Sequence, residues 1–410
     1  MEVNSGNIQN NIIISSKTPT EEEKTFESQN INYFPYSKNN YEMKFLNLYY
    51  ATFKYERFKL THLEVEKPPY GECFSCNFDE SGNYLAAGFS NGYVNIFNLI
   101  PNAQKKFVDF QIGDYPITSL KFNKSLKSTL LAGSADGTVS HYHSGTGKLL
   151  HRIQEEGNAI NSVDYSNDGR KFATGGNDIS VRLYDEGMKT LICKMQPYKF
   201  NEPGHSGRIF AVKFNPENSN TIFSGGWDKT IQFYDCREGK IVNSIYGPHI
   251  CGDALDIHGF TLLTGAWSTE KQIQLWDIRN LKCMLDVKWD NGNTYYPTYI
   301  YSCKFNTRKD LKLFGVGGVN KNMFRIFDID KFNFTNKKKK KKEDSDNEEE
   351  DIVVQPLSKE LNEPIPIFGD KEMKVSCFCT DWVRISQRKE YFATGCNDGG
   401  VRIYSVESKN

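Results

Sequence analysis

Two short cysteine motifs are the first candidates for chemistry in this sequence. Cys73-Phe-Ser-Cys76 and Cys377-Phe-Cys379 supply four thiols, and four thiolates can form a tetrahedral zinc site. Both motifs lie in stretches patterned like β-strands, where residues three apart point to opposite faces unless a bulge intervenes. The pattern therefore favours buried structural cysteines, and a zinc site is the minor alternative.

Other residue types with catalytic potential form no motif. His141 and His143 stand two apart on one face of an expected strand, but the remaining histidines are dispersed, so a packed or solvent-facing pair is expected. The sequence has no G-x-x-x-x-G-K-[ST], G-x-S-x-G or H-E-x-x-H motif. Several carboxylates stand in turns, where they satisfy backbone amides; they are Asp136, Asp178, Asp228 and Asp398. We expect no catalytic residue, no metal and no cofactor.

The turn carboxylates belong to one pattern that recurs seven times. An apolar pair and a glycine lead into a polar turn, and an alternating run then ends on an aromatic residue. The copies are LAAGFSNGYVNIF (85–97), LLAGSADGTVSHY (130–142), FATGGNDISVRLY (172–184), FSGGWDKTIQFY (223–234), LLTGAWSTEKQIQLW (262–276), FGVGGVNKNMFRIF (314–327) and FATGCNDGGVRIY (392–404). Their spacing fits repeats of roughly 40–45 residues, except that the last interval contains an insertion.

The segment upstream of each copy completes a repeating unit. CFSCNFDESG and INSVDYSNDG are two examples of an alternating run that enters a polar turn, as the first strand of a hairpin does. Glycine pairs recur at 175–176, 225–226 and 317–318, and turn geometry is the expected reason. No single copy buries its apolar faces alone, so the copies should stack around an axis. The predicted fold is all-β, a seven-bladed β-propeller of four-stranded antiparallel blades.

With these repeats the chain resembles the WD-repeat family, over roughly residues 60–408. Gly204-His205 stands where that family has its Gly-His pair, and Trp276-Asp277 where it has its Trp-Asp dipeptide. The Trp-Asp place is also taken by Tyr184-Asp185, Tyr234-Asp235 and Phe327-Asp328. The resemblance implies a hydrogen-bonded structural tetrad in blade four, made of His205, Ser224, Asp228 and Tyr234. It also implies a scaffold that binds other proteins or peptides.

The predicted domain boundaries follow from the repeats. Residues 41–410 form the propeller, and its ring is closed by an N-terminal strand near 58–65 (FKLTHLEV) that adds an outer strand to blade seven. Residues 1–40, rich in Asn, Ser and Glu, are expected to be a disordered tail. The cluster at 33–36 (YFPY) either packs on the propeller or is a short linear motif for a partner.

A charged low-complexity insertion separates blades six and seven at 333–365. It contains the lysine run Lys337–Lys342 followed by an acidic block, and blocks of like charge do not fold. A solvated loop with no specific task is the simplest interpretation. The alternatives are a nuclear import signal and a contact with an acidic surface. Ser345 lies in an acidic context and is a candidate phosphorylation site.

Two tryptophans mark the expected partner-binding face. We name the four strands of each blade a to d from the axis outward, and the top face is the one that carries the b–c and d–a loops. Trp227 and Trp267 occupy b–c turns of adjacent blades, where nothing in the repeat demands tryptophan and where the residue type is typical of interface hot spots. Packing against a neighbouring loop is the alternative. Further candidates on this face are Phe89, Arg182, Arg325 and Arg402.

The composition restricts the function classes. Lys+Arg and Asp+Glu are both 51, so no global field draws the protein to nucleic acid or membranes. No apolar stretch approaches the roughly 20 residues of a membrane helix, and no secretory signal pattern is present. We therefore expect an intracellular protein that is cytoplasmic, with cytoskeletal association or nuclear entry through Lys337–Lys342 as alternatives.

The sequence as a whole predicts a non-catalytic scaffold for protein–protein interactions within a multiprotein complex, with a cytoskeletal or ciliary assembly as the narrower form. A chromatin or nucleic-acid adaptor that uses the lysine run is the alternative. A propeller enzyme is the least supported interpretation. Neither a membrane partner nor a homo-oligomer is predicted.

Overall fold

The structure is a computed structural model that describes residues 52–54, 58–66, 70–100, 106–126, 128–197, 203–287, 289, 298–307, 313–319, 324–329, 332–336, 352–356 and 375–408. Every element in this part of the chain is a β-strand. The residues from Tyr50 to Asn410 form one compact unit, and the description below concerns that unit. No helix that would be long and apolar enough to cross a membrane occurs among the described residues.

The first four blades are antiparallel four-stranded sheets that follow one another along the chain. Blade one contains β3 (Cys73–Phe78), β4 (Tyr84–Phe89), β5 (Tyr93–Asn98) and β6 (Lys106–Gln111). Blade two contains β7 (Ile117–Phe122), β8 (Thr129–Ser134), β9 (Thr138–His143) and β10 (Lys148–Gln154). Blade three contains β11 (Ile160–Tyr165), β12 (Lys171–Gly176), β13 (Val181–Asp185) and β14 (Leu191–Met195). Blade four contains β15 (Ile209–Asn215), β16 (Asn218–Gly226), β17 (Thr230–Asp235) and β18 (Lys240–Tyr246).

The remaining blades vary the same plan. Blade five contains β19 (Leu255–His258), β20 (Thr261–Gly265), β21 (Ile273–Asp277) and β22 (Lys282–Val287). Blade six contains β23 (Tyr299–Phe305), β24 (Leu313–Val319) and β25 (Phe324–Asp328). Blade seven contains β28 (Cys377–Arg384), β29 (Lys389–Cys396) and β30 (Val401–Ser408). Its sheet continues outward through β2 (Phe58–Glu66) and β1 (Thr52–Lys54).

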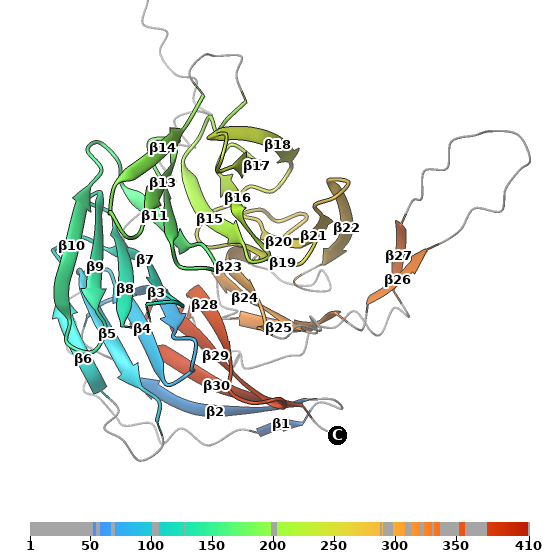
Figure 1. The fold of residues 1–410 in the computed structure, drawn as a ribbon. Helices are drawn as coiled ribbons and strands as arrows, with labels where there is room; N and C mark the ends of the chain where they lie inside the picture. Colours follow the sequence, from blue (N-terminus) through green and yellow to red (C-terminus); the bar gives the residue numbers. More distant parts are fainter. Residues whose placement is uncertain are drawn as a thin grey trace, which may run out of the picture. The chain divides into compact units, whose positions relative to one another are not determined.

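The seven blades form a closed ring, which confirms the predicted fold class (Figure 1). Each inner strand contacts the inner strand of the next blade, and β28 of blade seven contacts β3 of blade one. The segment that the sequence assigned to ring closure lies in β2, which pairs antiparallel with β30. The ends of the ring are therefore joined by strand pairing between segments far apart in the sequence.

The recurring glycine of strand b has a different reason from the one predicted. Gly265 has no left-handed backbone, and a Cβ placed on it would lie 2.3 Å from Cγ2 of Ile300 in the next blade. Gly88 is crowded in the same way by Ile117 of blade two. Close approach of neighbouring blades, rather than turn geometry, requires glycine at this position.

The tight b–c turns do require glycine for their backbone. Gly92 has φ +80°, and a Cβ there would lie 1.8 Å from the carbonyl oxygen of Gly113 in the adjacent connection. Any other residue would meet both strain and a clash. The turn therefore fixes how β4 reverses into β5.

Part of the predicted insertion is structured as a separate hairpin. β26 (Phe332–Asn336) pairs with β27 (Ile352–Pro356) and with no other strand of the described chain. The charged block between these strands, including Lys337–Lys342 and Ser345, lies outside the described residues, as do residues 1–40. The predictions made for those segments remain predictions.

Candidate functional site on the top face

The hydrogen-bonded group expected in blade four is assembled in the structure. Nδ1 of His205 lies 2.7 Å from Oδ2 of Asp228, and Nε2 lies 2.6 Å from Oγ of Ser224. The Ser224 hydroxyl lies 3.2 Å from the hydroxyl of Tyr234. The d–a loop, β16, the b–c turn and β17 each supply one member, so the group fastens the loops of the top face to the sheet.

Three members of this group have the connectivity of a hydrolytic Ser-His-Asp triad, but their surroundings differ from those of a catalytic site. Ser224 is fully buried, and its hydroxyl is occupied by Tyr234. Burial would raise the pKa of Asp228, but the hydrogen bond from His205 holds that pKa below its ordinary value. A nucleophile must reach a substrate carbonyl, and this hydroxyl has no exposed surface from which to do so.

Blade three builds a comparable network around a residue that the sequence analysis missed. Glu155, in the d–a loop, accepts hydrogen bonds from Oγ1 of Thr174 at 2.6 Å and from the hydroxyl of Tyr184 at 2.9 Å. Its other oxygen lies 2.9 Å from the guanidinium of Arg182. The sequence does contain a signal for this role. Glu155 stands shortly before the inner strand of blade three, and His205 stands at nearly the same distance before the inner strand of blade four.

The arginines predicted to face a partner are not free to do so. Arg182 is buried between Glu155 and Asp178, and its Nη2 lies 2.5 Å from Oδ2 of Asp178. Arg402 is likewise buried and bonds Asp398, with Nη2 2.6 Å from Oδ2. These two side chains fasten b–c turns to strand c. Their assignment to the binding face is corrected accordingly.

Of two further candidates, Phe89 is buried, and Arg325 is half-buried against an aromatic ring. Phe89 is fully buried and meets Tyr70 edge to face, with ring centroids 5.6 Å apart. The guanidinium of Arg325 lies 5.0 Å from the ring centroid of Trp289, which is itself buried. The sequence indicated Phe89 by its place at the b–c turn and Arg325 by its polar place on strand c, and neither place reveals these contacts.

Trp227 and Trp267 remain at the top face and are half-buried. Trp227 lies 5.6 Å from the ring of Phe210 and 5.8 Å from that of His249, and Arg208 sits over its face at 5.7 Å. Trp267 stacks on Tyr299 with centroids 5.0 Å apart. Both predicted alternatives describe these residues in part, since each indole packs on neighbours and keeps some surface exposed.

The two indoles belong to a larger arc of aromatic residues that the sequence analysis did not identify. The ring centroid of Tyr301 lies 6.1 Å from that of Trp267 and 5.2 Å from that of Phe378. Phe378 in turn stacks on Phe74, with ring centroids 5.1 Å apart. Four of the aromatic residues each follow the first buried residue of an inner strand, and all four are half-buried: Phe74, Phe210, Tyr301 and Phe378. We call the set the aromatic arc: Phe210, Trp227, Trp267, Tyr301, Phe378 and Phe74. Blades two and three carry Thr118 and Asn161 at the equivalent place, so the arc covers only one side of the ring.

The inner strands carry oxygen acceptors and lysines that alternate around the ring. One position per blade holds, in order, Asn77, Lys121, Asp164, Lys213, Asp256, Lys304 and Asp381. The oxygen acceptors join neighbouring blades, because Asp164 accepts from the amide of Phe214 and Asp256 from that of Phe305, both at 2.8 Å. Asp381 accepts from the amide of Phe78 at 2.8 Å and closes the ring.

One further carboxylate, from blade five, lies between two of these lysines. Asp253 lies 2.6 Å from Nζ of Lys213 and 3.1 Å from Nζ of Lys304. Its enclosure would raise its pKa, but the two ammonium groups hold the pKa of Asp253 below its ordinary value. The carboxylates of the inner strands and Asp253 thus join neighbouring blades, and this structural role accounts for their position.

The cysteine motifs meet where the ring closes. Sγ of Cys73 lies 4.0 Å from Sγ of Cys379, and both residues are buried together with Cys76. The bulge that the sequence analysis required is present between Cys73 and Ser75, but equivalent bulges occur in blades without cysteines. No group of three or more His, Cys, Asp or Glu side chains suited to a metal ion occurs in the described part of the chain.

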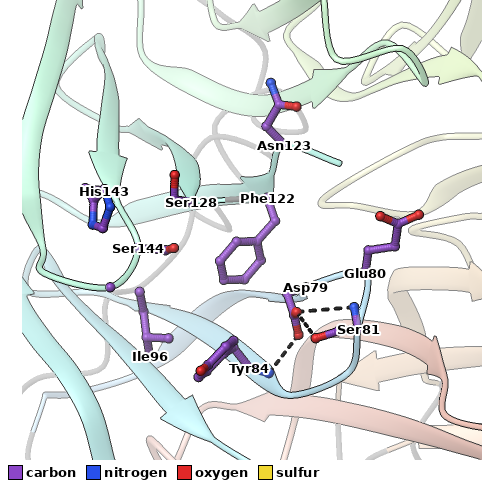
Figure 2. Close-up of a pocket in the computed structure, with 11 residues that line it drawn as sticks. Asp79, Glu80, Ser81, Tyr84, Ile96, Phe122, Asn123, Ser128, His143 and Ser144 are labelled. Carbon is purple, nitrogen blue, oxygen red and sulfur yellow. Dashed lines mark hydrogen bonds between the residues drawn. The ribbon is translucent and has the colours of Figure 1, made fainter. Parts of the chain in front are cut away.

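A hollow of about 570 Å³ opens on the opposite face, between blades one and two (Figure 2). Phe122, Ile96 and Tyr84 contribute its apolar surface, and Asp79 and His143 also line it. Asp79 is held by its own turn, where it accepts from the amide of Tyr84 at 2.7 Å, and the ring of His143 bonds Thr146 at 3.2 Å. The lining therefore offers a binding surface rather than a pair of reacting groups.

The ring of similar blades and the blade-four network together define a β-propeller built from internal repeats. Comparison with known proteins places it further. The model of the family "WD domain, G-beta repeat" matches residues 147–185 and 196–235, which lie in blades two to four. These two stretches are therefore identified as WD repeats, in agreement with the resemblance of the other blades, and the sub-family is not assigned.

The relatives are distant and mostly longer. The chain is 25% identical to the WD repeat-containing protein slp1 of Schizosaccharomyces pombe, over 45% of the chain and 38% of that protein. It is 22% identical to cell division cycle 20.1, cofactor of APC complex, of Arabidopsis thaliana, over 58% of the chain and 51% of that protein. A striatin homolog of Dictyostelium discoideum is 24% identical over 56% of the chain and 28% of its own length. The matches span about half or less of these curated relatives.

Proposed function

We propose that this chain is a non-catalytic scaffold that holds other proteins in an intracellular multiprotein complex through the aromatic arc of its top face. WD-repeat propellers characteristically bind other proteins, and the family match supports that class of function. We further propose a cytoplasmic location, with a cytoskeletal or ciliary complex as the narrower form.

The aromatic arc is the observation that carries this proposal. Its side chains come from blades four to seven and blade one, and each keeps part of its ring exposed. Large rigid rings contribute contact area at a low entropy cost, and tryptophan and tyrosine dominate interface energetics. Arg208, which is exposed over Trp227, adds a cation at the rim that would orient a partner.

A cross-linking experiment in native lysate tests the proposal. Wild type is compared with Trp227→Ala/Trp267→Ala and with Arg208→Glu, because the arginine is exposed and its exchange reverses a charge without removing a ring. We expect a reproducible set of cross-linked proteins that is lost or reduced about tenfold in both variants, since hot-spot truncation costs 1–2 kcal/mol or more. Phe260→Ser, an exposed aromatic on the opposite face, is the matched control.

The measured melting temperature shows whether each variant remains folded. If folded variants retain all of the wild-type cross-links, the aromatic arc is structural and the proposal fails. Cross-links that contain only nucleic-acid-binding proteins and vanish with nuclease treatment would favour the adaptor alternative instead.

A further inference from the structure

The outer strands of blades two, three and four expose large apolar side chains. Leu149 and Leu150 on β10, Leu191 and Ile192 on β14, and Val242 on β18 are each between 44% and 54% exposed. Met188, in the turn before β14, is 76% exposed. Exposed large apolar residues that recur on three successive outer strands are candidates for an interaction surface.

A repeated backbone feature places one of these residues in each blade. The pairing of the outer strand with strand c skips a residue at the same point each time, and the skipped residue is Leu150, Ile192 or Val242. A β-bulge of this kind re-aims a side chain relative to the regular ladder. The three bulge residues therefore form an ordered row rather than isolated exposures.

Contacts also join the three blades that carry the row. On one side, His141 lies 3.0 Å from Glu186 of the blade-three turn, and the ring of His151 on β10 is 6.1 Å from that of His141. On the other side, a Cβ placed on Gly239 of the blade-four turn would lie 3.6 Å from Cβ of Cys193 on β14. Each of the first two blades thus contacts a turn of the next blade, and we call the exposed surface of β10, β14 and β18 the outer wall.

The charge of the outer wall has a single sign. β10, β14 and β18 contain Lys148, Arg152 and Lys240 on exposed positions and no aspartate or glutamate. Among the described residues Arg152 donates hydrogen bonds to Ser140, Tyr142 and the carbonyl of Ile112, and its charge also acts on Asp136 in the b–c turn of blade two. Asp235, in the blade-four turn, is paired with Arg237. The exposed Glu238 beside it and the exposed Glu156 just after β10 are nearby carboxylates that oppose this pattern.

We infer that the outer wall docks an acidic amphipathic segment of a protein partner, one that combines leucine, isoleucine or phenylalanine with aspartate or glutamate. The apolar row would be covered by the partner's apolar residues, and the flanking cations would pair with its carboxylates. This surface is separate from the aromatic arc, so the inference goes beyond the proposed function and stands without it.

The arrangement of the blades favours a chain segment over an anionic membrane. β10, β14 and β18 lie one after another around the perimeter of the ring, so their outer surfaces face in different directions (Figure 1). A flat bilayer meets one such surface at a time, whereas an extended or helical segment can follow the curve. Three bulge residues in three blades are then used together.

Selection from a random 16-residue peptide library displayed on phage tests the inference. Peptides are selected on the full chain and counter-selected on Leu150→Ser/Ile192→Ser/Val242→Ser, whose exposed positions tolerate serine. We expect recovered peptides to be enriched in acidic and large apolar residues. Their affinity, measured by fluorescence anisotropy, should fall at least about tenfold on the serine variant and about fivefold on Lys148→Glu/Lys240→Glu.

Matched variants keep the result interpretable. Leu126→Ser/Phe260→Ser/Ile385→Ser removes three exposed apolar residues from other places and should bind the peptides like wild type. Trp227→Ala/Trp267→Ala should also bind them normally, which separates this inference from the top-face proposal. Recovered peptides without acidic enrichment, or equal binding by the folded serine variant, would overturn it. So would phosphatidylserine vesicles that bind through the same residues while no peptide does.

Discussion

Glu155 and His205 solve the same problem with different chemistry. Each lies in a d–a loop, and each binds the hydroxyl of a strand-b residue, Thr174 in blade three and Ser224 in blade four. The carboxylate reaches Tyr184 directly and adds Arg182 as a counter-ion, whereas the imidazole reaches Asp228 in the turn. Burial and the nearby Glu155 both raise the pKa of Tyr184, so its phenol stays protonated and donates.

Replacement of Glu155 by alanine should destabilise the protein by about 3 kcal/mol, because Arg182, Thr174 and Tyr184 would lose a shared buried acceptor. Glu155→Gln keeps an acceptor oxygen but loses the ion pair, so its cost should be about half as large. Urea denaturation followed by tryptophan fluorescence measures both. Glu156→Ala, the exposed neighbour, is the control and should change stability by less than about 0.5 kcal/mol. Equal effects of the two alanine variants would contradict the role given to Glu155.

At this scale the sequence revealed motifs but not environments. His205, Ser224, Asp228 and Tyr234 could be named because each stands at a fixed place in a repeat. Phe89 and Arg182 were misplaced because burial by the neighbouring blade and the distant partner Glu155 leave no mark on the local pattern. The aromatic arc was overlooked for a similar reason, since its members meet only when the blades close around the axis.

The inner strands show how one element recognises the next. An acceptor side chain on one inner strand takes the backbone amide of its neighbour, as Asn77 does for Phe122 at 2.8 Å and Asp164 does for Phe214 at 2.8 Å. In the intervening blades the same inner-strand position holds a lysine, and Nζ of Lys121 lies 3.5 Å from Oδ1 of Asp164. Because seven is odd, two acceptor blades must adjoin, and there Asp381 meets the neutral Asn77, whose amide donates to it at 2.9 Å.

Removal of one such acceptor should loosen a single junction. In Asp164→Ala the buried amide of Phe214 loses its acceptor and Lys121 loses its counter-ion, so stability should fall by about 2–3 kcal/mol. Hydrogen exchange should quicken at β11 and β15 before it does at β28 and β3 on the other side of the ring. Asp164→Asn retains an acceptor oxygen and serves as the matched variant, with a smaller effect on β15. Uniform quickening over all blades would show that the acceptor does not act locally.

The repeat of strands was predictable, and the joints between strands were less so. The hairpins were predictable from two kinds of residue, namely turn residues such as the Asn91-Gly92 pair and the aromatic residue at the end of each strand c. The strand-b glycine was assigned to turn geometry because its neighbour in space, such as Ile300 for Gly265, belongs to another blade. The bulges of the outer strands could not be predicted from the sequence either, because a skipped residue depends on how two strands pair.

The molecule as a whole depends on a junction that covalent structure does not provide. β30 carries the last residues of the described chain, and its outer neighbour is β2 from the start of the ring. The pairing runs from Phe58 opposite Ser408 to Glu66 opposite Val401. Every other described blade is completed by strands that follow one another along the chain, so this pairing holds the two ends of the ring together.

Loss of β2 should therefore weaken the entire ring. A chain shortened to begin at Lys67 should melt about 5–15 °C below one that begins at Tyr50, because a strand's worth of cross-strand pairs is lost and the edge of β30 is exposed. A synthetic peptide of residues 50–66 should bind that edge and raise the melting temperature of the shorter chain in a concentration-dependent way, as any ligand of the native state does. A peptide of the same composition in scrambled order should have no effect. Equal melting temperatures of the two chains would mean that the ring is held by the inner strands alone, with β28 and β3 as its true closure.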